Sequence, residues 1–135
     1  MAVQLGTSVR NARLDAIETT IGTSAILKIR TGAQPADCGT ADSGSVLATL
    51  NLPSDWMAAA SGGSKAKSGT WQDASADAAG TAGHFRIYDS GGTVCHMQGT
   101  VTATGGDGDI TVDNTVLAAG QVFTMNAFTL TDANS

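Results

Sequence analysis

Apolar and polar residues alternate at helical spacing near the start of the chain. Between residues 7 and 21, one face collects apolar side chains while polar side chains occupy most of the remaining surface. The apolar positions are Val9, Ala12, Ala16, Ile17 and Ile21, and the polar ones include Arg10, Asn11, Asp15 and Glu18. Thr7 or Ser8 can serve as N-cap, and Gly22 stands where a C-cap glycine belongs. The pattern predicts one amphipathic helix that packs on the sheet or reaches a neighbouring subunit.

After residue 22 the helical spacing gives way to short segments typical of β-strands. Residues 25–30 mix β-branched residues with alternating charge, which places Lys28 and Arg30 on one outer face. A loop rich in Gly, Pro and Asp follows over residues 31–45. A second strand is predicted over residues 46–52, which Pro53 ends.

The second half of the chain contains further strand signals. A short strand is a candidate over residues 67–72, and strands are predicted over residues 109–112 and 121–130. In the last of these the apolar alternation changes phase near Asn126 and Ala127, which predicts a β-bulge at that point.

The clearest local signal is a β-hairpin formed by residues 83–89 and 93–99. A three-residue loop with a left-handed glycine keeps apolar residues on one face, since it pairs Phe85 with Met97 and Ile87 with Cys95. In this register Cys95 points into the core. The residues expected to lie outward are His84, Arg86, Tyr88, His96 and Gln98, with His96 facing Arg86.

One helix followed by several short strands indicates a mainly β protein. We expect an antiparallel β-sandwich, jelly-roll-like, with one N-terminal α-helix. Residues 1–22 would form an N-terminal helical arm and residues 23–135 the β-sandwich domain. A chain of 135 residues can bury a core without needing a metal or disulfides.

Composition and net charge limit the kinds of molecule that this protein could bind. Charged residues make up only 14% of the chain and aromatic residues 4%, so few long charged side chains cover the surface. The formal net charge of −5 argues against nucleic acid as a partner, because phosphate binding needs a field of Lys and Arg. The only dense basic spot is Lys65 with Lys67, for which a solvated loop or a contact to an acidic protein surface are the two interpretations.

The sequence shows few features of protein targeting and no recognised cysteine motif. The first five residues lack the basic and apolar regions of a signal peptide, and no apolar run reaches the length of a membrane span, so we expect synthesis in a cytoplasm and no membrane partner. Cys38 and Cys95 lie outside any C-x-x-C pattern, which leaves a metal or redox motif unsupported. We expect both cysteines to be reduced and packed.

No pattern in the chain predicts a catalytic centre or a cofactor. The spacings of a nucleophile elbow, a zinc protease helix and a phosphate-binding loop do not occur, so we expect no enzyme activity. Asp107, Asp109 and Asp113 are a weak calcium candidate, although turns beside a strand explain the same residues. Trp56 and Trp71 are expected in the core or in a partner interface.

Several segments together resemble the small virion structural proteins of tailed bacteriophages. These are residues 8–22 (SVRNARLDAIETTIG), 27–36 (LKIRTGAQPA), 47–56 (LATLNLPSDW), 80–101 (GTAGHFRIYDSGGTVCHMQGTV) and 123–131 (FTMNAFTLT). The likeness spans nearly the full length and brings no catalytic or ligand motif with it.

The resemblance implies a capsid decoration, or cement, protein on the outside of a phage head. Its expected partners are the major capsid protein and further copies of itself in a homo-oligomer, with a trimer as one arrangement. Expected contact residues, besides the two tryptophans, are His84, Arg86, Tyr88 and Lys65. Two alternatives stay open: a ring protein of the phage tail or neck, and a β-sandwich module that binds a glycan or calcium.

Overall fold

The computed structural model of the protein describes residues 3–125 and 127–132. It begins with helix α1 (Thr7–Ile21) and continues almost entirely in strands. The strands are β1 (Ile26–Thr31), β2 (Val46–Asn51), β3 (Ser64–Ala66), β4 (Trp71–Asp73), β5 (Gly80–Tyr88), β6 (Cys95–Ala103), β7 (Ile110–Val112), β8 (Val116–Leu117), β9 (Phe123–Met125) and β10 (Thr129–Thr131). The predicted mainly β class with a single N-terminal helix is confirmed.

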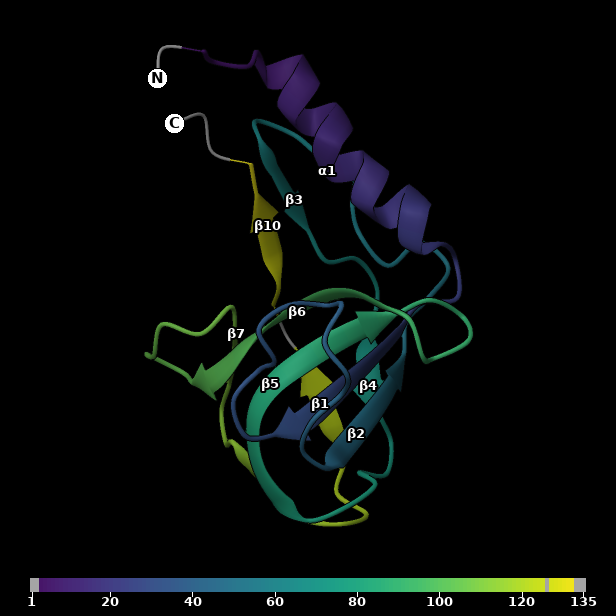
Figure 1. Ribbon diagram of the computed structural model, residues 1–135, viewed down its shortest axis with the longest axis vertical. Coiled ribbons are helices and arrows are strands. Elements are labelled where there is room, and N and C mark those ends of the chain that lie inside the picture. The colour runs from purple at the N-terminus through teal and green to yellow at the C-terminus, as the bar shows by residue number, and fades with distance from the viewer. Residues whose placement is uncertain (1–2, 126, 133–135) are drawn as a thin grey trace.

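One curled sheet dominates the molecule (Figure 1). Its strand order is β2-β1-β5-β6-β7, and β8 pairs with the start of β5. Every pairing is antiparallel except that of β6 with β7, which is parallel. Two smaller two-stranded sheets, β4-β9 and β3-β10, complete the fold. The pair β3-β10 extends from one end of the sheet alongside α1 (Figure 1).

The hydrophobic core lies on one face of the main sheet. Aromatic side chains from the sheet and from the segments outside it pack together there. Trp71 lies between Trp56 and Phe128, with ring centroids 5.9 and 5.7 Å away, and Phe128 meets Phe85 edge-on. Each indole N–H has an acceptor inside the chain, since Trp56 donates to the carbonyl of Gly22 and Trp71 to that of Trp56. Both tryptophans are fully buried, so core packing is the correct interpretation of these two residues.

The hairpin of β5 and β6 forms, but the predicted register is wrong. Phe85 lies opposite Gly99 and Ile87 opposite Met97, and a bulge then brings Tyr88 opposite Cys95. The connection is longer than three residues because Asp89 forms a turn of its own, accepting the N–H of Gly91 on its side chain and that of Gly92 on its carbonyl. The Phe85 ring occupies the space that a side chain at Gly99 would need.

The C-terminal segment divides between two sheets. Phe123–Met125 pairs with β4, whereas Thr129–Thr131 pairs with β3. The change of phase in the sequence therefore marks a change of partner strand. The predicted β-bulge involves Asn126, which lies outside the described residues. The candidate strand at residues 67–72 is β4 and starts later than predicted.

Helix α1 has the predicted bounds but packs on the opposite side from the one expected. Val9, Ala12 and Ala16 are exposed, although Ile21 at the end of the predicted apolar face is buried. The polar residues Asn11, Asp15 and Glu18 face the chain, because backbone N–H groups of residues 57–63 need acceptors there. The helix starts at Gly6 without a side-chain cap, so the predicted Thr7 or Ser8 cap is wrong, and Gly22 closes it as predicted.

Candidate functional site

The outer face of the main sheet, opposite the core, is crossed by a loop that we call the strap, residues 32–45. It connects β1 to β2 and is closed at its base, where the N–H of Thr31 donates to the carbonyl of Ser45. Gly32 and Gly44, near its two ends, have φ angles of 80° and 71°, a backbone conformation that favours glycine. Every strap residue is exposed or half-buried, so the strap adds no side chain to the core.

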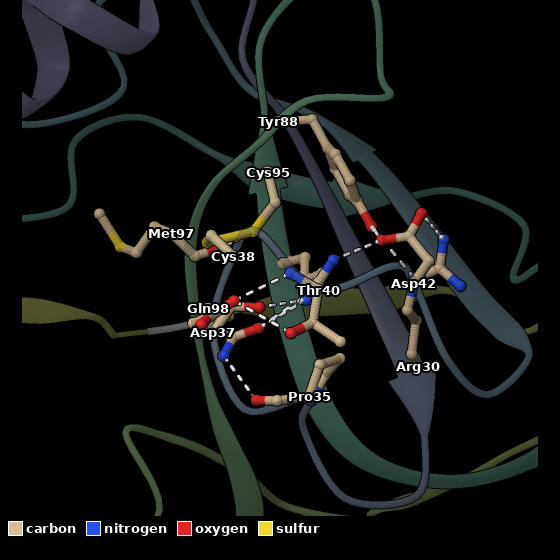
Figure 2. Close-up of a disulfide and its surroundings, with 11 residues drawn as sticks. Arg30, Pro35, Asp37, Cys38, Thr40, Asp42, Tyr88, Cys95, Met97 and Gln98 are labelled. Carbon is tan, nitrogen blue, oxygen red and sulfur yellow. Dashed lines mark hydrogen bonds and ion pairs between the residues drawn. A yellow bond between two sulfur atoms is a disulfide. The ribbon is translucent and has the colours of Figure 1, made fainter.

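A disulfide between Cys38 and Cys95 joins the strap to β6 (Figure 2). The expectation that both cysteines are reduced is therefore wrong, as is the expectation that Cys95 points into the core. The bulge in the hairpin turns Cys95 to the outer face, and the strap folds back so that the two Cα atoms lie 5.2 Å apart. Both cysteines are half-buried.

Asp42 of the strap makes the central ionic contact of the site. One carboxylate oxygen accepts hydrogen bonds from the Tyr88 hydroxyl and from Nη1 of Arg86, each 2.8 Å long. The other oxygen accepts from Nη2 of Arg30 at 3.0 Å. Figure 2 shows the carboxylate lying between the tyrosine and the Arg30 side chain. A single strap carboxylate is thus shared by two guanidinium groups.

The two sheet residues Arg86 and Gln98 bind the middle of the strap through polar contacts. Arg86 donates from Nη2 to the carbonyl of Asp37 at 3.0 Å and also to the side-chain oxygen of Gln98. Gln98 in turn donates to the carbonyl of Pro35 at 2.8 Å. These contacts use the donors of Arg86 inside the protein, which is why a residue of this type can be only 2% exposed.

The environment of Asp42 favours its charged form. Burial alone would raise the pKa of this carboxyl group, but the hydrogen bonds from Tyr88 and Arg86 and the charge of Arg30 outweigh it and hold the pKa below the ordinary value. Burial and the hydrogen bond to Asp42 raise the pKa of Tyr88. Asp42 is therefore ionised and Tyr88 neutral at physiological pH.

The structure corrects the expectation that the outer hairpin residues form an exposed contact surface. His84, Arg86 and Tyr88 do point away from the core, but the strap covers them and all three are buried. Nδ1 of His84 donates to the strap carbonyl of Gly32 at 2.9 Å. His96 does not face Arg86 and lies 3.5 Å from the carboxylate of Asp89. The sequence suggested no cover because the strap lacks apolar residues with a strand or helix period.

Lys65 is buried as well, at the contact between β3 and helix α1. Its ammonium group lies 2.7 Å from Asp15 and 3.1 Å from Glu18. Burial lowers the pKa of Lys65, but the hydrogen bonds to both carboxylates outweigh it and raise the pKa above its ordinary value. Both earlier interpretations, a solvated loop and a contact to another protein, are wrong for Lys65, because its charge is matched by the chain's own helix.

The acidic residues of the calcium candidate support the β6-β7 connection. Asp109 accepts the backbone N–H and the hydroxyl of Thr100, and Asp113 accepts the hydroxyl of Thr104. Within residues 3–125 and 127–132, no group of three or more His, Cys, Asp or Glu side chains is arranged to hold a metal ion. Asp107 takes part in no such cluster.

Comparison with protein-family models, with curated proteins and with solved structures finds no match. In the part of the chain that the structure describes, no helix has the length and apolar character to cross a lipid bilayer.

The arrangement under the strap is suited to binding a carboxylate. Arg30, Arg86 and Tyr88 present donors from two adjacent strands to one point, and Asp42 occupies that point. Sequence reasoning missed Arg30 and Asp42 as parts of a site. The available signal was the alternation that places Lys28 and Arg30 on one face of their strand, and Arg86 and Tyr88 on one face of theirs, since several cationic side chains on outer strand faces favour an acidic partner.

Proposed function

We propose that this protein is a structural virion protein that binds the outside of a phage head and stabilises it as a decoration, or cement, protein. Its partners would be the major capsid protein and further copies of the same chain. It would be made in the host cytoplasm and act on the capsid surface, with no catalytic step. The role is mechanical, because apolar area buried at each contact raises the free energy needed to separate capsid subunits.

The observation that carries this proposal is the orientation of helix α1. Its polar residues are used inside the chain, while Val9, Ala12 and Ala16 line the exposed side. Ile17, next to them, is half-buried and packs against the core. Leu14 and Ile21 of the same helix are buried, so the exposed apolar strip is the part of the helix that its own domain does not cover, and such a strip favours contact with another subunit.

The internal cross-links of the domain suit a load-bearing role. The strap is fastened to the sheet by a disulfide and by Asp42, and α1 is fastened to β3 through Lys65. Groups that carry catalysis in many enzymes are engaged in such contacts, since His84 bonds to Gly32 and Cys38 to Cys95. These observations support a rigid binding domain over an enzyme.

The proposal is tested with heads of the encoding phage prepared without the protein. Purified protein is added, and co-sedimentation and the temperature at which the heads burst are measured. Binding at a fixed ratio to the capsid subunit, with a higher bursting temperature, is the expected result. Binding to tails or necks instead of heads would overturn the cement role and favour the ring-protein alternative.

Two variants distinguish a specific effect at the exposed helix face from a general effect of added surface charge. Ala12→Glu places a carboxylate in the middle of the exposed helix face, whereas Gln72→Glu adds the same charge at an exposed position on β4. We expect Ala12→Glu to abolish co-sedimentation and Gln72→Glu to retain it, with unchanged circular dichroism in both. Equal binding by the two variants would exclude α1 as the contact surface.

A further inference from the structure

We infer that Arg30, Arg86 and Tyr88 form a carboxylate-binding site that Asp42 fills from within the chain, and that reduction of the Cys38–Cys95 disulfide frees this site for a carboxylate of an acidic protein partner. The inference is independent of the proposed function.

The carboxylate-binding site is built from the side chains of Arg30, Arg86 and Tyr88. Its three donors are almost completely buried, and each makes a short contact to Asp42, with lengths of 2.8 Å for Tyr88 and Arg86 and 3.0 Å for Arg30. The donors belong to the rigid central strands β1 and β5, whereas the acceptor belongs to a loop. The site is therefore preorganised by the sheet, and the bound carboxylate is the part that can be exchanged.

The strap is held on the sheet by one covalent link and by polar contacts. It contributes no buried side chain of its own, so its departure exposes only the polar and aromatic side chains that it covers, which are those of His84, Arg86 and Tyr88. The strap is held by the disulfide, by the Asp42 contacts and by hydrogen bonds to strap carbonyls, and at its base by hydrogen bonds between Thr31 and Ser45. The carbonyls that accept hydrogen bonds from the sheet are those of Gly32, Pro35, Asp37, Ser43 and Gly44. A segment held in this way belongs to the least stable part of a fold once its covalent link is cut.

The disulfide lies at the surface, where a reductant can reach it. Both cysteines are half-buried, and a surface groove lined by residues that include Cys38, Cys95, Asp42 and Arg86 leads to the disulfide and the ionic contact together. A dithiol reductant supplies the two electrons and two protons that convert the disulfide into two cysteine thiols. The reductant is itself oxidised to a disulfide.

The positive charge of the site indicates which ligand it would bind. Two guanidinium groups share one carboxylate, which leaves one positive charge in excess among these three groups. Lys28 adds a further cation, 5.1 Å from the centre of the Tyr88 ring. An Asp or Glu side chain of another protein matches these donors in shape and charge, as Asp42 does.

The first experiment tests the site while the disulfide stays intact. Asp42→Ala removes the internal carboxylate, and Asp37→Asn is the matched control, because the Asp37 side chain bonds only within the strap, to Thr40. Sodium acetate is compared with sodium chloride at equal ionic strength. Acetate at ten times its Kd should raise the folded-to-unfolded ratio of Asp42→Ala about elevenfold and leave Asp37→Asn unchanged. An equal response of both variants would overturn the site.

The second experiment tests release by reduction. Hydrogen exchange of the strap amides is compared in oxidised protein and in protein treated with dithiothreitol, with the amides of β1 and β5 as the internal reference. Faster exchange confined to the strap is expected, and unchanged exchange would overturn the role of the disulfide. Cys38→Ser provides the same open state without reductant.

The third experiment distinguishes the source of the carboxylate. Hexaglutamate and hexaglutamine peptides are titrated into Cys38→Ser and into oxidised wild-type protein. Hexaglutamate should bind Cys38→Ser at least tenfold more tightly than it binds oxidised wild type, and hexaglutamine should bind neither. If acetate binds the open variant as tightly as hexaglutamate does, the ligand is a small carboxylate and the protein partner is excluded. If neither binds, release by reduction is overturned even where Asp42→Ala responds to acetate.

Discussion

Replacing Gly99 by alanine tests the contact that sets the register between β5 and β6. A Cβ atom at this position would lie 2.6 and 2.8 Å from two ring carbons of Phe85 and 2.8 Å from a carboxylate oxygen of Asp109. Carbon atoms in contact normally lie about 3.5–4.0 Å apart, so the ring would have to move by about 1 Å. Phe85 is 1% exposed and packs edge-on against Phe128, which leaves the ring little room to move.

The change in the free energy of unfolding caused by Gly99→Ala combines two opposing effects. Overpacking a core costs about 1–3 kcal/mol, while alanine in place of glycine within a strand favours folding by about 0.5–1 kcal/mol. We therefore expect Gly99→Ala to lower the free energy of unfolding by about 1–2 kcal/mol. Urea unfolding followed by the fluorescence of the two buried tryptophans, Trp56 and Trp71, measures this difference.

A double-mutant cycle with Phe85→Leu identifies the cause. Leucine removes the ring carbons that the new Cβ atom would touch, so Gly99→Ala should cost less in that background, with a coupling of at least about 0.5 kcal/mol. Additive effects, or a Gly99→Ala protein more stable than wild type, would refute the reasoning. The register of the hairpin would then need another physical origin.

Three further predictions concern the charged and covalent contacts. Lys65→Met should raise the hydrogen-exchange rates of α1 amides by roughly tenfold, and Lys67→Met, which removes an equal charge at a less buried position, should not. Reducing the disulfide between Cys38 and Cys95, which are 57 residues apart, should lower the free energy of unfolding by about 4 kcal/mol, and an unchanged urea midpoint would contradict this. The pKa of Asp42 is lower in the folded protein than its ordinary value of 3.8. The ionised carboxylate therefore contributes its full stabilisation above the unfolded-state pKa. This stabilisation is lost as the pH falls through the lower folded-state pKa. Urea midpoints of wild type and Asp42→Asn should accordingly converge below about pH 4, and a constant difference would contradict the assignment.

Local patterns account for the parts of the fold that were predicted well. Helix α1 ends at Gly22 because a glycine can close the last turn, and the strands β1 and β2 follow runs of β-branched residues. Lys28 and Arg30 share an outer strand face as their alternation predicts, and both contact Tyr88. These features depend on residues close together in the chain.

The side on which α1 packs could not be predicted from periodicity. The helix pattern assumes an apolar partner surface, whereas the segment facing α1 presents the backbone N–H groups of Met57, Ala60 and Gly63, which donate to side chains of the helix. Satisfying buried backbone donors outweighs burying Val9 and small alanine side chains, because an unpaired donor costs about 1–3 kcal/mol.

The amino-acid sequence by itself determined the class of this protein: one helix, a set of short strands and a low surface charge. Only the tertiary structure decided which groups meet. The strap joins Cys38 to Cys95 and brings Asp42 to Arg86, 44 residues away, and it covers side chains that alternation alone would leave in solvent. Periodicity reports which face of an element is apolar, but long-range pairing depends on how loops fold back, and the strap has no periodic signal.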